Sequence, residues 1–132
     1  MKKAIVLTIT LITFAMIFAG CCFKNNGETS PEYKKITASQ AYDMMNEKEV
    51  TVVDVRTKSE YEKGHIKDAI LIPNETIDSA LPTQLPDKNA IILVYCRSGR
   101  RSREAAEKLI KLGYKNVYDF GGINDWTYGT VK

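Results

Sequence analysis

Hydrophobic residues in this chain form short continuous runs that alternate with segments of helical periodicity. The runs 50–55 (VTVVDV) and 90–95 (AIILVY) have the length and β-branched content of strands that are buried on both faces. Shorter runs at 70–72 and 117–120 are consistent with further strands. Strands of this kind belong to parallel sheets, because helices cover both faces of such sheets.

The segments between the runs carry helix signals. Thr37 and Gln40 match a capping box that predicts a helix through about residue 47, and Thr57 and Glu60 match a second box for a short helix that stops at a glycine. Residues 102–112 predict the longest helix, with small and aliphatic residues at helical spacing. The pattern predicts an α/β fold, a three-layer sandwich with a central parallel β-sheet flanked by helices.

Some segments are harder to assign. Residues 76–85 contain Pro82 and precede Pro86, so any helix there should be short or broken. The pair Gly121-Gly122 should turn into a closing helical segment that carries Trp126, and it could let the backbone approach another loop closely.

The N-terminus reads as a targeting segment. Two lysines precede an uncharged apolar stretch, which predicts a signal peptide over residues 1–20. The tetrapeptide Phe18-Ala19-Gly20-Cys21 resembles the lipobox of bacterial lipoproteins, so we expect lipidation at Cys21 and a tether over 21–35. The domain, residues 36–132, would then be anchored to the cell membrane and face its extracytoplasmic side. An uncleaved membrane helix or ordinary secretion are the alternatives.

Composition bounds the possible partners. Without residues 1–20 the chain has 17 basic and 16 acidic residues, so it is nearly neutral and lacks the basic character of a nucleic-acid-binding protein. There are three cysteines, of which Cys21 and Cys22 are adjacent, and this is no disulfide framework. We expect a single-domain monomer without a metal or cofactor. Cys22 is either an incidental neighbour of Cys21 or a partner for Cys96.

The segment CRSGRRS, residues 96–102, carries the candidate chemistry. Cys96 follows a predicted strand and precedes a predicted helix, at the edge of the sheet where ligands bind in open α/β folds. Loop amides, the helix dipole and the arginines Arg97, Arg100 and Arg101 would all favour an anion there. We therefore expect Cys96 to be a reactive thiolate. The alternative is that Cys96 is a small, inert core residue.

The same segment resembles the active-site loop of the rhodanese family of sulfurtransferases. The segments VVDVR (52–56), EYEKGHIKDAILIP (60–73) and GGINDW (121–126) resemble that family in the same order, with a departure at Asp68, where a glycine is usual. Asp tolerates the left-handed conformation that such a turn would need. The resemblance extends over residues 36–128.

The resemblance implies transfer of sulfur from a small anionic donor such as thiosulfate to a thiophilic acceptor, cyanide or a thiol, through a persulfide on Cys96. The residues that it places in the substrate loop are Arg97, Ser98, Gly99, Arg100, Arg101 and Ser102. It implies a bracing role for Asp54 and Arg56 and a structural one for His65.

Three other roles remain possible at this point. Asp54 could act as a catalytic acid. A cysteine phosphatase or arsenate reductase would resemble Cys-x5-Arg, but the sixth residue after Cys96 is Ser102 and the arginine follows at Arg103. The chain could also be a non-catalytic module that binds a partner or carries sulfur.

Overall fold

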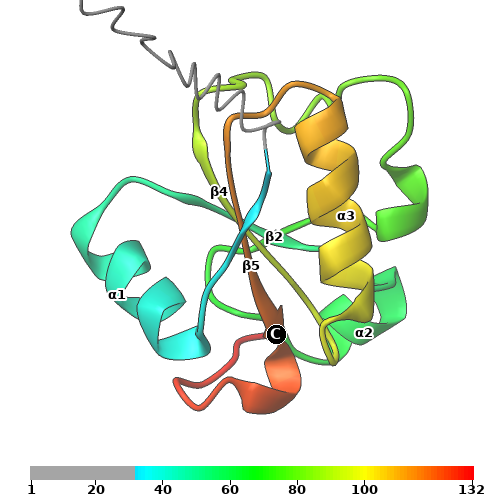
Figure 1. Cartoon of the computed structure of the whole chain (residues 1–132). Coiled ribbons are helices and arrows are strands. Elements are labelled where there is room, and N and C mark those ends of the chain that lie inside the picture. The colour runs from blue at the N-terminus through cyan, green and yellow to red at the C-terminus, as the bar shows by residue number, and fades with distance from the viewer. Residues whose placement is uncertain (1–31) are drawn as a thin grey trace, which may run out of the picture.

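A computed structural model describes residues 32–132, which form an α/β sandwich around a parallel sheet. The strand order is β1-β5-β4-β2-β3, and every neighbouring pair is parallel (Figure 1). The strands are β1 (Lys34–Lys35), β2 (Thr51–Asp54), β3 (Ile70–Leu71), β4 (Ile91–Cys96) and β5 (Asn116–Gly122). The sequence-based prediction of fold class is confirmed.

The predicted signal peptide, Cys21 and Cys22 lie outside the described residues, so lipidation stays a prediction. The sheet begins earlier than the sequence indicated, because Lys34 and Lys35, assigned to the tether, form β1 and pair with Tyr118 and Asp119 of β5. In the described part of the chain, no helix combines the length and the apolar character needed to cross a bilayer.

Helices cover both faces of the sheet. Figure 1 shows α1 (Ala38–Glu47) on one side and α3 (Arg100–Lys111) with α2 (Lys58–Lys63) on the other. Two short 3-10 helices, η1 (Asn74–Thr76) and η2 (Ile123–Asp125), complete the set. No helix spans 77–85, which agrees with the expectation drawn from its prolines.

The core has two halves because strand side chains alternate between the faces. Val53 and Val94 pack with α3, whereas Val52 and Tyr95 pack on the α1 side. Each half is completed by its helix: Ala105, Ala106 and Leu109 on one side, and Ala41 on the other.

Local signals set the helix ends. Both predicted capping boxes form, at Thr37 and at Thr57. Helix α3 ends in a Schellman motif: Gly113 has φ 96°, and the Tyr114 N–H donates to the carbonyl of Leu109 at 3.1 Å. Asp68, which stands where related sequences usually have glycine, has φ 63°. The turn there is left-handed, and Asp adopts it as expected.

Candidate active site

Cys96 is the last residue of β4, and its side chain is turned toward the loop that leads into α3. The residue is only 1% exposed and touches the α3-side core. Its sulfur nevertheless accepts the N–H of Gly99 at 3.0 Å. Gly99 has φ 111°, a left-handed conformation that favours glycine, and it lies just before the first residue of α3, Arg100. The helix thus begins two residues earlier than predicted, immediately beside the sulfur.

The loop favours the ionised form of this thiol. Burial raises the pKa of Cys96, but the backbone amides of Ser102, Gly99 and Ser98 oppose it by favouring the thiolate. The net result is a pKa below the ordinary thiol value. The interpretation of Cys96 as an inert core residue does not account for these inward-pointing amides.

A bulge in β5 places Gly122 against the loop that follows Cys96. The register between β4 and β5 shifts after Val94, so Cys96 pairs with Gly122. A Cβ on Gly122 would overlap the carbonyl of Arg97, and this carbonyl also accepts the Asn124 N–H at 3.2 Å. The predicted close backbone approach at the glycine pair is confirmed.

We expect Gly122→Ala to displace the loop. Overpacking of this kind lowers the free energy of unfolding by about 1–3 kcal/mol. It should also change the alkylation rate of Cys96, because the Arg97 carbonyl shares a peptide unit with the Ser98 amide, which favours the thiolate. Urea denaturation and site-resolved alkylation measure the two effects.

The matched control is Gly129→Ala, which meets open space at a φ of 87°. It should affect stability through backbone strain alone and leave the reactivity of Cys96 unchanged. Equal alkylation rates in both variants would contradict the close approach at Gly122.

Asp54 and Arg56 form a buried pair beside this edge of the sheet. Both Asp54 oxygens accept from the Arg56 side chain, at distances from 2.6 to 3.0 Å, and Oδ2 also accepts the Tyr95 hydroxyl at 2.7 Å. Arg56 reaches on to the carbonyl of Gly64 at 2.8 Å. Burial lowers the pKa of Arg56, but Asp54 outweighs it and the pKa is raised. These contacts favour bracing over acid catalysis for Asp54.

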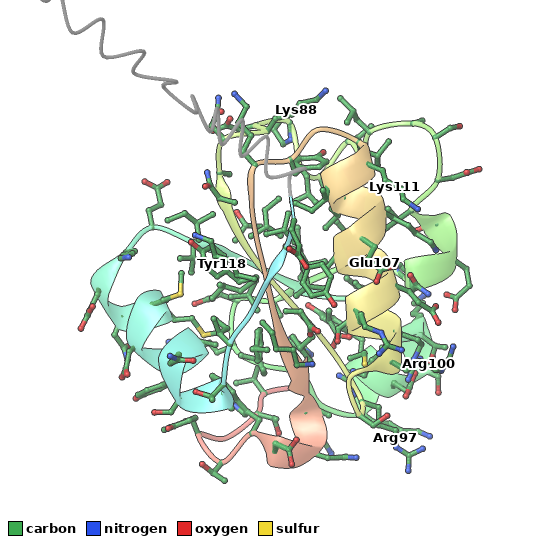
Figure 2. All side chains as sticks on the ribbon, in the orientation of Figure 1. Lys88, Arg97, Arg100, Glu107, Lys111 and Tyr118 are labelled. Atoms are coloured by element: carbon green, nitrogen blue, oxygen red, sulfur yellow. The ribbon has the colours of Figure 1, made fainter. Side chains whose placement is uncertain are left out.

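The loop arginines separate in space, contrary to the simple expectation of one positive cluster. Arg101 donates to both oxygens of Glu60 in α2, at 2.8 and 3.0 Å. Arg100 pairs with Glu104 one helical turn away, at 2.9 Å. Arg97 makes no ion pair with any residue in 32–132. Figure 2 shows Arg97 and Arg100 at the end of α3 that adjoins the loop.

The Glu60–Arg101 pair predicts a stability that depends on pH. The hydrogen bonds from Arg101 hold the pKa of Glu60 at about 2, below its usual 4.5. A depressed folded-state pKa contributes stability above the unfolded value, and the contribution is lost as the pH falls from about 4.5 to 2. We expect Glu60→Gln to be about 1 kcal/mol less stable at pH 7.

This difference should vanish near pH 2, as measured by urea denaturation across the pH range. Gln still satisfies the capping box at this position, so the helix start is preserved. A Glu60→Gln deficit that is the same at pH 7 and at pH 2 would contradict the assigned pKa.

A buried network behind Cys96 was missed by the sequence analysis. Ser102 lies 3.7 Å from the sulfur, and its hydroxyl donates to Oδ1 of Asp119 at 2.7 Å. Asp119 is fully buried, and its other oxygen accepts Nζ of Lys35 at 3.1 Å. A charged residue inside the otherwise apolar run VYDF was the available signal.

His65, the chain's one histidine, is occupied elsewhere. Its ring stacks on Tyr61 at 3.7 Å, and Nδ1 lies 3.0 Å from the Tyr61 carbonyl. This agrees with a structural role. Among residues 32–132 there is no group of three or more potential metal ligands.

An open pocket of about 350 Å³ adjoins the loop. Two of its lining charges are already used, since Arg56 pairs with Asp54 and Glu60 with Arg101. The lysine and arginine that remain make the pocket suited to a small anion. Its walls are Arg56, Glu60, Lys63, Gly64, Arg97, Ile123, Asn124 and Thr130.

Known proteins are similar to this chain in sequence and fold. The rhodanese-like domain family matches residues 37–128. The thiosulfate sulfurtransferase PspE of Escherichia coli is 39% identical over 80 residues, which are 61% of this chain and 77% of that protein. A tRNA uridine(34) hydroxylase of Hamiltonella defensa is 34% identical over 102 residues, which are 74% of this chain but 29% of the hydroxylase.

A solved structure agrees with the fold. The rhodanese-like domain protein of Staphylococcus aureus is 36% identical, with a TM-score of 0.66, and the match covers 74% of this chain and 96% of that one. Together with the family match over most of the described residues, these relatives show that the chain belongs to the rhodanese-like domain family.

Proposed function

We propose that this protein is a sulfurtransferase that moves a sulfane sulfur atom through a persulfide on Cys96. The observation that carries the proposal is the 3.0 Å hydrogen bond from the Gly99 amide to the sulfur, in a loop that lowers the pKa of the thiol. A thiolate is the nucleophilic form of cysteine. The relative named as a thiosulfate sulfurtransferase supports the same class of reaction.

The reaction would proceed by two displacements. The Cys96 thiolate attacks the outer sulfur of a donor such as thiosulfate, the donor's S–S bond breaks, and its electron pair leaves with sulfite. An acceptor such as cyanide then attacks the terminal sulfur of the persulfide. The second S–S bond breaks, thiocyanate departs, and the thiolate is restored. No external oxidant or reductant is needed.

The loop would stabilise the charge at each stage. The amides of Ser98, Gly99 and Ser102 favour the thiolate, and they are placed to favour the persulfide anion that replaces it. Arg97, free of an ion pair within residues 32–132, would attract the anionic donor. Arg100 and Arg101 would contribute mainly through their amides and by holding the loop, because their side chains are paired.

Treatment of the purified protein with thiosulfate tests the proposal. Mass spectrometry should show a gain of one sulfur atom, which peptide mapping should place on Cys96 and not on Cys21 or Cys22. Cyanide should then remove the sulfur as thiocyanate. Absence of any gain on Cys96 would overturn the proposal.

The same preparation separates the alternatives. A sulfur carrier would gain the sulfur but would not pass it to cyanide as thiocyanate. A cysteine phosphatase would hydrolyse an aryl phosphate ester. We expect no hydrolysis, because Ser102 stands at the phosphatase position, Arg101 beside it is paired with Glu60, and Arg103 is exposed on α3.

A further inference from the structure

The Ser102 hydroxyl has one proton and several acceptors around it. The carboxylate of Asp119 is nearest, with Oδ1 at 2.7 Å, and the carbonyls of Gly99 and Gly121 lie at 3.1 and 3.2 Å. The sulfur of Cys96 is farther away, at 3.7 Å. A hydrogen bond to an ionised acceptor is the strongest of these, so the proton belongs to Asp119.

This orientation determines what Cys96 meets. With the hydroxyl proton turned toward Asp119, Ser102 presents a lone pair to the sulfur and can only accept from the thiol. If Ser102 donated to the thiolate instead, Asp119 Oδ1 would keep only one hydrogen bond, from the Gly121 N–H at 2.9 Å. Asp119 and the thiolate therefore compete for one proton.

We propose that Asp119 is a positioning residue that holds the Ser102 hydroxyl proton away from the sulfur of Cys96. Asp119 makes no hydrogen bond to the sulfur and does not line the pocket beside the loop, so it acts through Ser102. It is fixed from both ends, by the Gly121 amide on one oxygen and by Lys35 on the other. Strand β1, which the sequence analysis left in the tether, thereby reaches the active loop.

The consequence for sulfur transfer rests on the proposed function. Amides that lower the pKa of a thiol also reduce the nucleophilicity of its thiolate, with a Brønsted slope of about 0.4–0.5. By keeping the Ser102 hydroxyl from donating to the thiolate, the Asp119 carboxylate limits this loss of nucleophilicity. With Asp119 in place, the amides would keep the sulfur ionised, and the thiolate would stay reactive toward a sulfur donor.

Other charges near this sulfur come from separate elements. Lys35 of β1 faces Asp119, with its side chain 62% exposed. Arg101 of α3 interacts with the charge of Cys96 and is paired with Glu60 of α2. Removing the charge of Asp119 leaves these two cations in place. Both favour the thiolate, so the pKa of Cys96 should fall in such a variant.

Asp119→Asn is the first variant to test. The amide can still accept from Ser102 and Gly121, so the loop keeps its anchor. The alkylation rate of Cys96, followed against pH in the full chain by mass spectrometry of its peptide, should show a midpoint lower by about one pH unit. The rate at the high-pH plateau should fall about threefold. A loss of structure alone would not produce both changes.

Two further variants make the result decisive. Ser102→Ala should remove most of the Asp119→Asn shift when the two are combined, because the intermediary is gone. Lys35→Met removes one of the nearby cations at an exposed side chain. It should raise the pH midpoint of Cys96 alkylation while the fold stays intact.

An unchanged midpoint in Asp119→Asn overturns the inference, and so does a shift of full size in the Ser102→Ala background. The assay uses neither sulfur donor nor acceptor. It can therefore fail while the persulfide test succeeds, and the reverse also holds.

Discussion

Replacing Cys96 with serine is expected to abolish thiocyanate formation from thiosulfate and cyanide. The serine hydroxyl is not ionised at neutral pH, and the loop amides that stabilise a thiolate cannot make it one. Loss of a covalent nucleophile elsewhere reduces turnover by about 10⁴-fold or more, so the rate should fall to background. A colorimetric assay of thiocyanate measures the effect.

The fold should survive this change, since serine is close in size to the buried cysteine it replaces. Circular dichroism and urea denaturation of Cys96→Ser check that point. The matched control is Cys22→Ser, which alters a thiol of the predicted tether and should retain turnover. Turnover that persists in Cys96→Ser and disappears in Cys22→Ser would transfer the chemistry to the other thiol and contradict the proposed mechanism.

The elements that were predicted correctly are those encoded by neighbouring residues. Strands β2 and β4 follow from unbroken apolar runs, and the capping boxes at Thr37 and Thr57 set two helix starts from four residues each. Strand β1 has no such signal, because it consists of two exposed lysines. It exists because its backbone pairs with β5, and Lys35 also reaches Asp119, 84 residues away in sequence.

The candidate site divides in the same way. The loop around Cys96 is contiguous, so its position between a strand and a helix was predictable. The pairing of Arg101 with Glu60 was not, because it joins residues 41 apart that the fold brings together. Asp119 was missed for the same reason: only the pairing of β4 with β5 places it behind Ser102.

Arg56→Met is expected to have the largest effect on stability among the changes considered for this protein. Arg56 supplies hydrogen bonds to both oxygens of Asp54, and both side chains are almost completely buried. Removing one partner of a buried pair leaves an uncompensated charge, which lowers the free energy of unfolding by about 3–5 kcal/mol. Urea denaturation at neutral pH measures the difference.

Two comparisons show whether the loss comes from the stranded charge. Lys58→Met breaks an exposed pair with Glu62 at 3.6 Å and should change stability by less than about 1 kcal/mol. The double variant Asp54→Asn, Arg56→Met removes both charges and should recover part of the stability, since a neutral amide can still accept the Tyr95 hydroxyl. If Arg56→Met is no less stable than Lys58→Met, the pair does not brace this edge of the sheet, and Asp54 would again be open to a catalytic role.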